Sequence, residues 1–276
     1  MECIKHDNMK IITLMEDTVG ASNVKAEHGL SVYVETKHHN LLMDTGASAQ
    51  TWENAKELGV DISKIDVVII SHGHYDHTGG LMEFARQNPM ADIYMQQSAG
   101  GEYFHGERYI GIDKNIMELP HLHLVEGDYR IDDELYLFSK ITGRTLWPES
   151  NLALSEKVND TLLQDHFLHE QCLVICNGNE KILLSGCAHN GILNILSRFY
   201  EIYHGYPDVV ISGIHMMKKT DYTEDEITRI EKTAYELIKF PTEFYTGHCT
   251  GQTAFDIMKD IMGGQLHQLH SGDLIF

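Results

Sequence analysis

Residues 71–80, SHGHYDHTGG, place four potential metal ligands in six positions: His72, His74, Asp76 and His77. Alternate side chains of an extended segment point the same way, so we expect His72 and His74 to face one point. Asp76 and His77 follow a further spacer, where the chain must turn, and they can face a second point nearby. Imidazole and carboxylate together suit Zn²⁺, with Fe and Mn as competitors. The segment therefore predicts a metal centre, with two adjacent ions favoured over one.

The neighbouring residues predict the elements that hold this segment. Residues 64–71, KIDVVIIS, form a nearly continuous apolar run, which is typical of a strand buried on both faces. Residues 79–89 predict a helix. Gly73 lets the backbone turn close to the ions, and Gly79 and Gly80 let the following helix approach. We expect the metal ligands to lie at the carboxyl end of a buried strand.

Two later histidines occupy a similar setting. His189 lies in GCAHNG (186–191) and His248 in YTGHCTG (245–251), and each stretch follows a predicted strand. Both histidines therefore lie in turns of small residues at strand ends, where they can add ligands to the same centre. Cys187 can also bind Zn²⁺ as a thiolate. It can equally be a small buried residue, and the sequence leaves that choice open.

These motifs carry a family resemblance that covers nearly the whole chain. The H-x-H-x-D-H signature, the LLMDTG stretch with Asp44 and the order of the later histidines resemble the metallo-β-lactamase superfamily of metal-dependent hydrolases. GCAHNG, EQCL (170–173), the stretch with Gly213 and His215, and HCTG resemble one branch, that of dihydropterin–ribofuranosylaminobenzene 5′-phosphate synthase. The resemblance implies one ion on His72, His74 and His189 and a second ion on Asp76, His77 and His248.

The chain departs from the superfamily pattern at two places. The usual bridging aspartate is replaced by Cys187, so the bridge is either a thiolate or only a water or hydroxide. His166 lies before the predicted strand CLVI (172–175), where many members of the superfamily have their third ligand. It is therefore an alternative to His189 as the third ligand. We favour His189 because GCAHNG matches the branch.

Two further residues are expected near the ions. Asp44 is predicted to hydrogen-bond a ligand histidine or a metal-bound water, which fixes the imidazole tautomer. A turn aspartate before Gly46 is the alternative. His215 is either a substrate contact or a core histidine.

The predicted chemistry is metal-dependent hydrolysis, or a related transfer, by a metal-bound hydroxide. Asp76 would orient the water or accept its proton. The resemblance adds a small substrate of phosphorylated or pterin-like character. Two alternatives stay open, an iron-dependent oxidoreductase on the same fold and a non-catalytic metal-binding protein.

Composition limits the partners. The chain has 276 residues and a net charge of −20, which argues against general nucleic-acid binding. No apolar run approaches the roughly 20 residues of a membrane helix, and the N-terminus does not resemble a secretory signal. The five cysteines form no disulfide framework, which is typical of reduced thiols in a cytoplasmic protein. The oligomeric state is left open.

The pattern of elements predicts an αββα sandwich, in which two mixed sheets pack together with helices on the outer faces, formed by a single domain over 1–276. The stretch 98–120 has no clear period and is expected to be a loop. Strands are predicted at 9–17, 30–36, 39–46, 64–71, 91–97, 121–127, 134–141, 172–176, 181–186, 208–215, 242–251 and 271–276, and helices at 51–60, 79–89, 191–205, 223–240 and 253–263.

Overall fold

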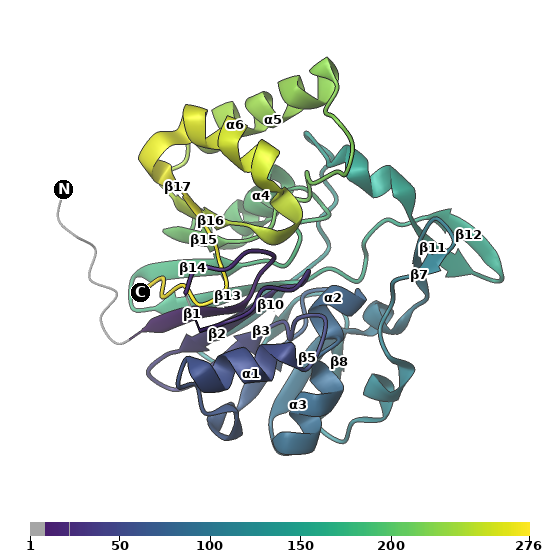
Figure 1. The fold of residues 1–276 in the computed structure, drawn as a ribbon, viewed down its shortest axis with the longest axis vertical. Coiled ribbons are helices and arrows are strands. Elements are labelled where there is room, and N and C mark those ends of the chain that lie inside the picture. The colour runs from purple at the N-terminus through teal and green to yellow at the C-terminus, as the bar shows by residue number, and fades with distance from the viewer. Residues whose placement is uncertain (1–8, 22) are drawn as a thin grey trace.

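Two mixed β-sheets pack face to face, and helices cover their outer surfaces (Figure 1). The computed structural model describes residues 9–21 and 23–276, so Cys3 lies outside the described residues. The four described cysteines are free thiols. The predicted αββα fold is therefore confirmed.

The first sheet has the order β1-β2-β3-β4-β5-β8. Its first three strands pair antiparallel, and the remaining neighbours pair parallel. The strands are β1 (Lys10–Met15), β2 (Ser31–Glu35), β3 (Asn40–Met43), β4 (Val67–Ile69), β5 (Asp92–Gln96) and β8 (Leu122–Val125).

The second sheet has the order β17-β16-β15-β14-β13-β10-β9. The strands from β14 to β17 pair parallel, so the carboxyl ends of β14, β15 and β16 lie at one edge of the sheet. The strands are β9 (Tyr129–Arg130), β10 (Leu135–Phe138), β13 (Cys172–Asn177), β14 (Glu180–Leu184), β15 (Val209–Ile211), β16 (Glu243–Thr246) and β17 (Leu266–Gln268).

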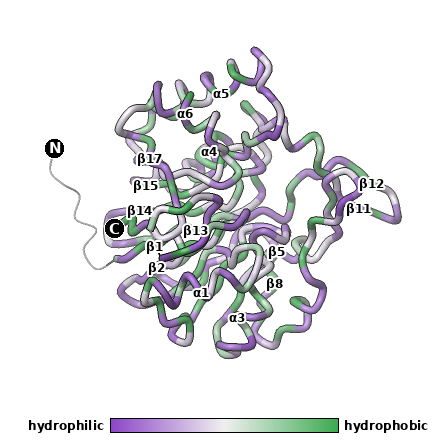
Figure 2. Tube along the Cα trace, viewed as in Figure 1, coloured by the Kyte–Doolittle hydropathy of each residue, from purple (hydrophilic) through white to green (hydrophobic). Residues whose placement is uncertain are grey.

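Six α-helices and several 3₁₀ turns complete the described chain. The helices are α1 (Gln50–Glu57), α2 (Tyr75–Thr78), α3 (Leu81–Gln87), α4 (Ile192–Tyr203), α5 (Glu224–Leu237) and α6 (Gln252–Met262). The 3₁₀ turns are Ile62–Lys64, Gln97–Gly100, Lys114–Glu118, Glu149–Ala153, His248–Thr250 and Gly263–Gln265. Hydrophilic and hydrophobic residues alternate along outer helices such as α5, as expected of helices with one buried face (Figure 2).

Three apolar layers hold the sandwich together. On β3, Leu41 and Met43 point into the layer between the sheets, whereas Leu42 points outward to the layer that contains Trp52 of α1. A separate apolar layer lies under α4, α5 and α6. A strand with helices on one face and a second sheet on the other is buried on both, which explains the continuous apolar runs.

A small third sheet was not predicted. It has the order β12-β11-β6-β7 and lies beside the sandwich (Figure 1). Its strands are β6 (Tyr103–His105), β7 (Arg108–Tyr109), β11 (Leu154–Val158) and β12 (Thr161–Gln164). The expected loop over 98–120 therefore contains two short strands. The terminal strand at 271–276 is also wrong, because this segment makes only isolated bridges to Ile12 and Val19.

His39 links the two sheets at the turn between β2 and β3. Its Nδ1 lies 2.6 Å from Asp66 Oδ2, and its Nε2 lies 2.6 Å from Asp132 Oδ2, which precedes β10 in the second sheet. Partial burial by itself lowers the pKa of His39, but the hydrogen bonds and charges of the two aspartates outweigh it and raise this pKa. A protonated His39 therefore ties the sheets together.

The stability contributed by His39 should depend on pH. Because its pKa is raised in the folded state, the contribution is full below the unfolded pKa and is lost as pH rises through the folded pKa. We expect His39→Gln to lower the free energy of unfolding by roughly 1 kcal/mol at about pH 5.5 and by less at about pH 9, since solvent screens the half-exposed carboxylates. Urea denaturation at both pH values measures the difference, and an equal loss at both would contradict the assignment.

Within the described residues, no helix combines the length and the apolar character needed to cross a membrane.

Candidate metal centre

The histidine-rich segment lies after β4, as predicted. His74 keeps an extended backbone at the start of α2, and its ring centroid lies 4.5 Å from that of His72. Asp76 and His77 lie in α2, so the turn expected after His74 is one helical turn. A side chain on Gly79 would meet the carbonyl of Ala47, so a glycine is needed for the junction of α2 and α3 to pack against the loop between β3 and α1.

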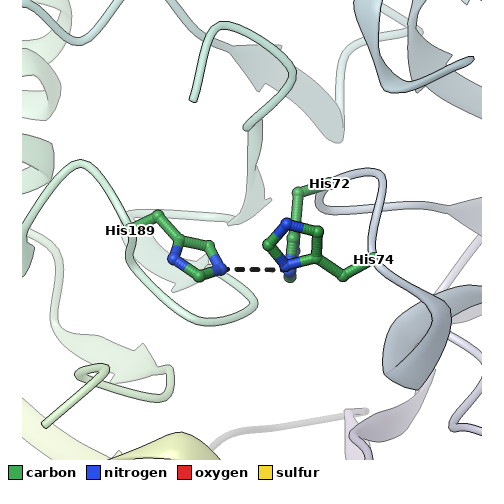
Figure 3. Close-up of side chains that lie close together, drawn as sticks. All are labelled: His72, His74 and His189. Carbon is green, nitrogen blue, oxygen red and sulfur yellow. Dashed lines mark hydrogen bonds between the residues drawn. The ribbon is translucent and has the colours of Figure 1, made fainter. Parts of the chain in front are cut away.

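His72, His74 and His189 form one group of buried imidazoles (Figure 3). The Nε2 atoms of His72 and His189 lie 3.3 Å apart. Tetrahedral Zn²⁺ with bonds of about 2.0–2.1 Å requires ligand atoms about 3.3 Å apart, so this spacing fits. The Nε2 of His74 is buried and has no hydrogen-bond partner. An unpaired buried nitrogen is costly unless something binds it, so the group fits a metal ion.

These imidazoles are neutral in the fold. Burial lowers the pKa of His74 to about 3 and lowers the pKa of His72 and of His189 well below the usual value. Neighbouring histidines lower the pKa of His72 and His189 further. A metal ligand must offer an unprotonated nitrogen, so burial prepares this group for binding.

Asp76, His77 and His248 form a second group beside the first. Asp76 Oδ2 lies 3.4 Å from His248 Nε2 and 3.8 Å from His77 Nε2. The Nε2 of His248 is buried and forms no hydrogen bond. Burial by itself would raise the pKa of Asp76, but His77 and His248 hold it well below its usual range. Asp76 is therefore a carboxylate and can hold a cation with the two imidazoles.

The turn with His248 is held by both ends of the described chain. Glu16, after β1, accepts a hydrogen bond from the backbone N–H of His248. The backbone N–H of Glu16 in turn donates to Ser271 Oγ at 2.7 Å. The segments after β1 and after β17 thus position a residue that follows β16. We call this three-residue contact of Glu16, His248 and Ser271 the Glu16 bracket.

Asp44 connects the two groups. Its Oδ2 accepts from His77 Nδ1 at 2.6 Å and from the hydroxyl of Ser71 at 2.7 Å. Because that hydroxyl donates to Asp44, its oxygen accepts from His72 Nδ1, at 2.7 Å. The Asp44 carboxylate therefore orients one histidine of each group, His72 and His77, so that the Nε2 atom of each ring faces the centre. The predicted hydrogen bond from Asp44 to a candidate ligand is present in the structure.

Cys187 lies between the two groups. Its Sγ is 3.1 Å from His77 Nε2, and it belongs to one cluster of potential ligands with His72 and to another with His248 and Cys249. Burial raises the pKa of the Cys187 thiol well above its usual value, and the nearby Cys249 adds to this effect. The sulfur therefore lies between the two groups, in the place of a ligand that would bridge two ions, and its raised pKa favours the protonated thiol.

His166 points away from the centre. Residues 165–169 alternate between buried and exposed positions, so His166 is exposed, while Asp165 and His169 are buried. The backbone turns here, because Phe167 has a φ of 54° and residues 168–169 form a turn, and this turn leaves His166 on the exposed side, outside the cluster. His169, which sequence analysis missed, accepts from the Gly73 N–H at its Nδ1 and pairs with Asp165 through Nε2, so both its nitrogens are occupied.

His215 lies against the first group. It follows β15, and its ring centroid is 4.1 Å from that of His189. Burial lowers the pKa of His215 to about 3, and Ser150 Oγ lies 2.6 Å from its Nδ1. The ring also lines a cavity of about 370 Å³. This position fits the substrate contact that the sequence left open.

Sequence analysis also missed Asp17 and His28 near the second group. His28 Nε2 lies 3.6 Å from Asp76 Oδ2, and Asp17 accepts from both His28 and His248. Locally, Asp17 is the last residue of the strand predicted at 9–17, and His28 precedes Gly29 and the strand predicted at 30–36, but neither position shows that the two residues meet the second group.

Comparison with known proteins identifies the family of this chain. Residues 24–222 match the model of the metallo-beta-lactamase superfamily. The chain therefore belongs to the metallo-β-lactamase superfamily, and its fold and histidine and cysteine clusters are those of a metal-dependent hydrolase or a related enzyme.

Three individual proteins are similar to most of this chain. The chain is 27% identical to the 7,8-dihydropterin-6-methyl-4-(beta-D-ribofuranosyl)-aminobenzene-5'-phosphate synthase of Methanocaldococcus jannaschii, over 98% of this chain and 97% of that protein. An uncharacterized protein of the same organism is 26% identical over 78% of this chain and 86% of its own. The solved structure of Tm1679, described as a metal-dependent hydrolase of the beta-lactamase superfamily, is 30% identical, with a TM-score of 0.81 over 98% of this chain and 99% of that one.

Proposed function

We propose that this protein is a metal-dependent hydrolase, or a related transferase, with two zinc ions at the centre built from His72, His74 and His189 and from Asp76, His77 and His248. The observation that carries the proposal is the convergence of three neutral, buried imidazoles in which the His74 Nε2 has no partner. A set rich in imidazole suits zinc better than iron, which prefers more carboxylates. The same motif also occurs with iron, so metal content decides between them.

Zinc ions bound here would supply a water that ionises near neutral pH and would polarise a carbonyl or phosphoryl oxygen of the substrate. Asp76 is held as a carboxylate by His77 and His248, so its low pKa makes it a weak base. It would orient the water rather than keep its proton. Asp44 holds the rings of His72 and His77, which keeps both Nε2 atoms directed inward.

The cavity beside His215 supports a small-molecule substrate. Its volume of about 370 Å³ falls within the usual range for such ligands. One part of its lining is apolar, from Pro148, Leu152 and Ile230. Another part holds two ion pairs, Lys218 with Glu226 at 2.8 Å and Arg229 with Glu149 at 2.5 Å.

This lining favours a flat, polar ring over a bare phosphate. The cations are already paired, so an anionic group would compete with carboxylates for them. A heterocycle such as a pterin can pack on the apolar side and hydrogen-bond to the paired side. The similarity to the dihydropterin synthase supports a pterin-like or phosphorylated substrate.

Metal analysis and activity together test the proposal. The purified protein should contain two zinc ions per chain by mass spectrometry, and it should hydrolyse a member of a panel of phosphoesters, lactones and pterin conjugates. Chelator treatment and His74→Ala should each abolish that hydrolysis. One iron per chain after aerobic purification would favour the oxidoreductase alternative. Metal binding with no turnover of any panel member, and no transfer with added acceptors, would favour a non-catalytic metal-binding protein.

A further inference from the structure

We propose that His28 is a fourth protein ligand of the second ion, held in place by Asp17. This inference rests on the proposed two-ion centre and extends it by a residue that the H-x-H-x-D-H signature does not include. His28 lies between β1 and β2, far in sequence from the other members of the second group. Its side chain is 45% exposed, so it lies on the solvent-accessible side of that group.

The first line of support is the distance of His28 from Asp76. Three Nε2 atoms surround Asp76 Oδ2, at 3.4 Å from His248, 3.6 Å from His28 and 3.8 Å from His77. The four atoms of a tetrahedral zinc shell lie about 3.3 Å from one another. His28 Nε2 therefore lies as close to Asp76 as the other two imidazole nitrogens do, and within reach of one ion.

The second line of support is a shared hydrogen-bond pattern. In His72, His77, His189 and His248, Nδ1 lies within hydrogen-bond distance of an oxygen, which leaves Nε2 directed at the centre. His28 repeats this pattern, because its Nδ1 lies 2.7 Å from Asp17 Oδ2. Histidine ligands almost always donate their second N–H in this way, which fixes the tautomer and orientation of the ring.

Asp17 joins His28 to His248. Its Oδ1 accepts from His248 Nδ1 at 2.6 Å, while its Oδ2 accepts from His28 Nδ1. The two rings lie 4.7 Å apart between centroids. One carboxylate thus aligns two imidazoles side by side, as Asp44 does for His72 and His77. The buried Nε2 of His248 forms no hydrogen bond and faces Asp76 Oδ2 at 3.4 Å, as expected if both atoms bind the same ion.

The assignment has a consequence for the two ion sites. The second group would have four protein donors, Asp76, His77, His248 and His28, whereas the first group has three imidazoles. Closed shells of four protein ligands are typical of structural zinc sites, and sites with three keep a position for water or substrate. His215, which lines the cavity, lies beside the first group.

Zinc titration tests the assignment. Metal-free protein is titrated with Zn²⁺ against a chromophoric chelator, which resolves the two affinities. We expect His28→Ala to weaken one of the two sites at least about 10-fold and to leave the other unchanged. His123→Ala is the matched control, because His123 also pairs with one aspartate and its side chain is 44% exposed. This control should bind both ions as the wild type does.

Cobalt spectroscopy gives a second readout that does not depend on activity. In His28→Cys loaded with Co²⁺, a thiolate at position 28 should add a sulfur-to-cobalt charge-transfer band in the near ultraviolet. The same band should not be gained in His123→Cys. Wild-type affinity for both ions in His28→Ala would overturn the assignment while leaving the two-ion centre intact. A wild-type protein that binds only one ion would contradict the two-ion centre itself, and His28 with it.

Discussion

Replacing His189 by alanine is expected to abolish most of the activity and to weaken zinc binding by at least about 100-fold, since even the residues that orient ligands are worth 10–100-fold. The Nε2 of His189 lies 3.3 Å from that of His72, and its Nδ1 is held by Asn151 Oδ1 at 2.9 Å. Removing it leaves only two imidazoles in the first group. Zinc content by mass spectrometry and kcat/KM on the substrate found in the panel measure the loss.

His166→Ala is the control for this prediction. It is adjacent in sequence to Phe167, whose ring stacks on His189, but its own side chain is exposed, so zinc binding and activity should remain near the wild-type values. His189 is buried and stacks on Phe167 at 4.4 Å, so alanine can also destabilise the fold. The variant His189→Gln, which keeps more of the volume, separates the two effects. If His189→Gln is folded and binds two zinc ions normally, the assignment of His189 is wrong.

Asp44→Asn should reduce zinc affinity by roughly 10–100-fold and lower kcat/KM in proportion, although Asp44 itself faces no ion. The carboxylate accepts from His77 Nδ1 and, through Ser71, sets the tautomer of His72. An asparagine can offer an N–H toward His77, which favours the wrong tautomer. A single change should therefore disturb both groups of ligands.

An effect of Asp44 on both groups of ligands can be told apart from an effect on one group alone. Zinc titration of Asp44→Asn should show both sites weakened, whereas His28→Ala should weaken one. Asp66→Asn is a matched control, since Asp66 also accepts from a histidine Nδ1 at 2.6 Å but lies at the link between the sheets. It should change neither site. If the first site of Asp44→Asn keeps its wild-type zinc affinity, the hydrogen bonds from His72 through Ser71 to Asp44 do not contribute to zinc binding.

The sandwich was predictable because burial on both faces leaves a mark on the sequence. Strands such as β4 and β14 consist of short apolar runs, and their carboxyl ends bear the small, polar turns with His72 and His189. The capping box of α5, formed by Thr223 and Glu226, follows a Thr-x-x-Glu spacing that is visible in the sequence. Each of these signals is local, so the sequence alone can reveal it.

Features that depend on contacts across the fold were not predictable in the same way. The strands β11 and β12 are largely exposed or half-buried and show no apolar period, so nothing local marks the small sheet. The choice between His166 and His189 depended on the tight turn at Phe167, which leaves His166 exposed and has no clear mark in the sequence. His28 and Asp17 join the site only because β1 and β2 bring them beside α2, a contact that spacing along the chain cannot express.

The Glu16 bracket bears on the order in which the protein acquires its metal during synthesis. The first and last described segments lie side by side, with Ile12 bridged to Leu274 (Figure 1). All three imidazoles of the first group exist once residue 189 has been made, but the second group waits for His248 and for Ser271, which supports Glu16. In the proposed two-ion centre, the ligands of the first ion are therefore complete earlier in synthesis than those of the second. The second ion would bind only after the segments that follow β1 and β17 have come together.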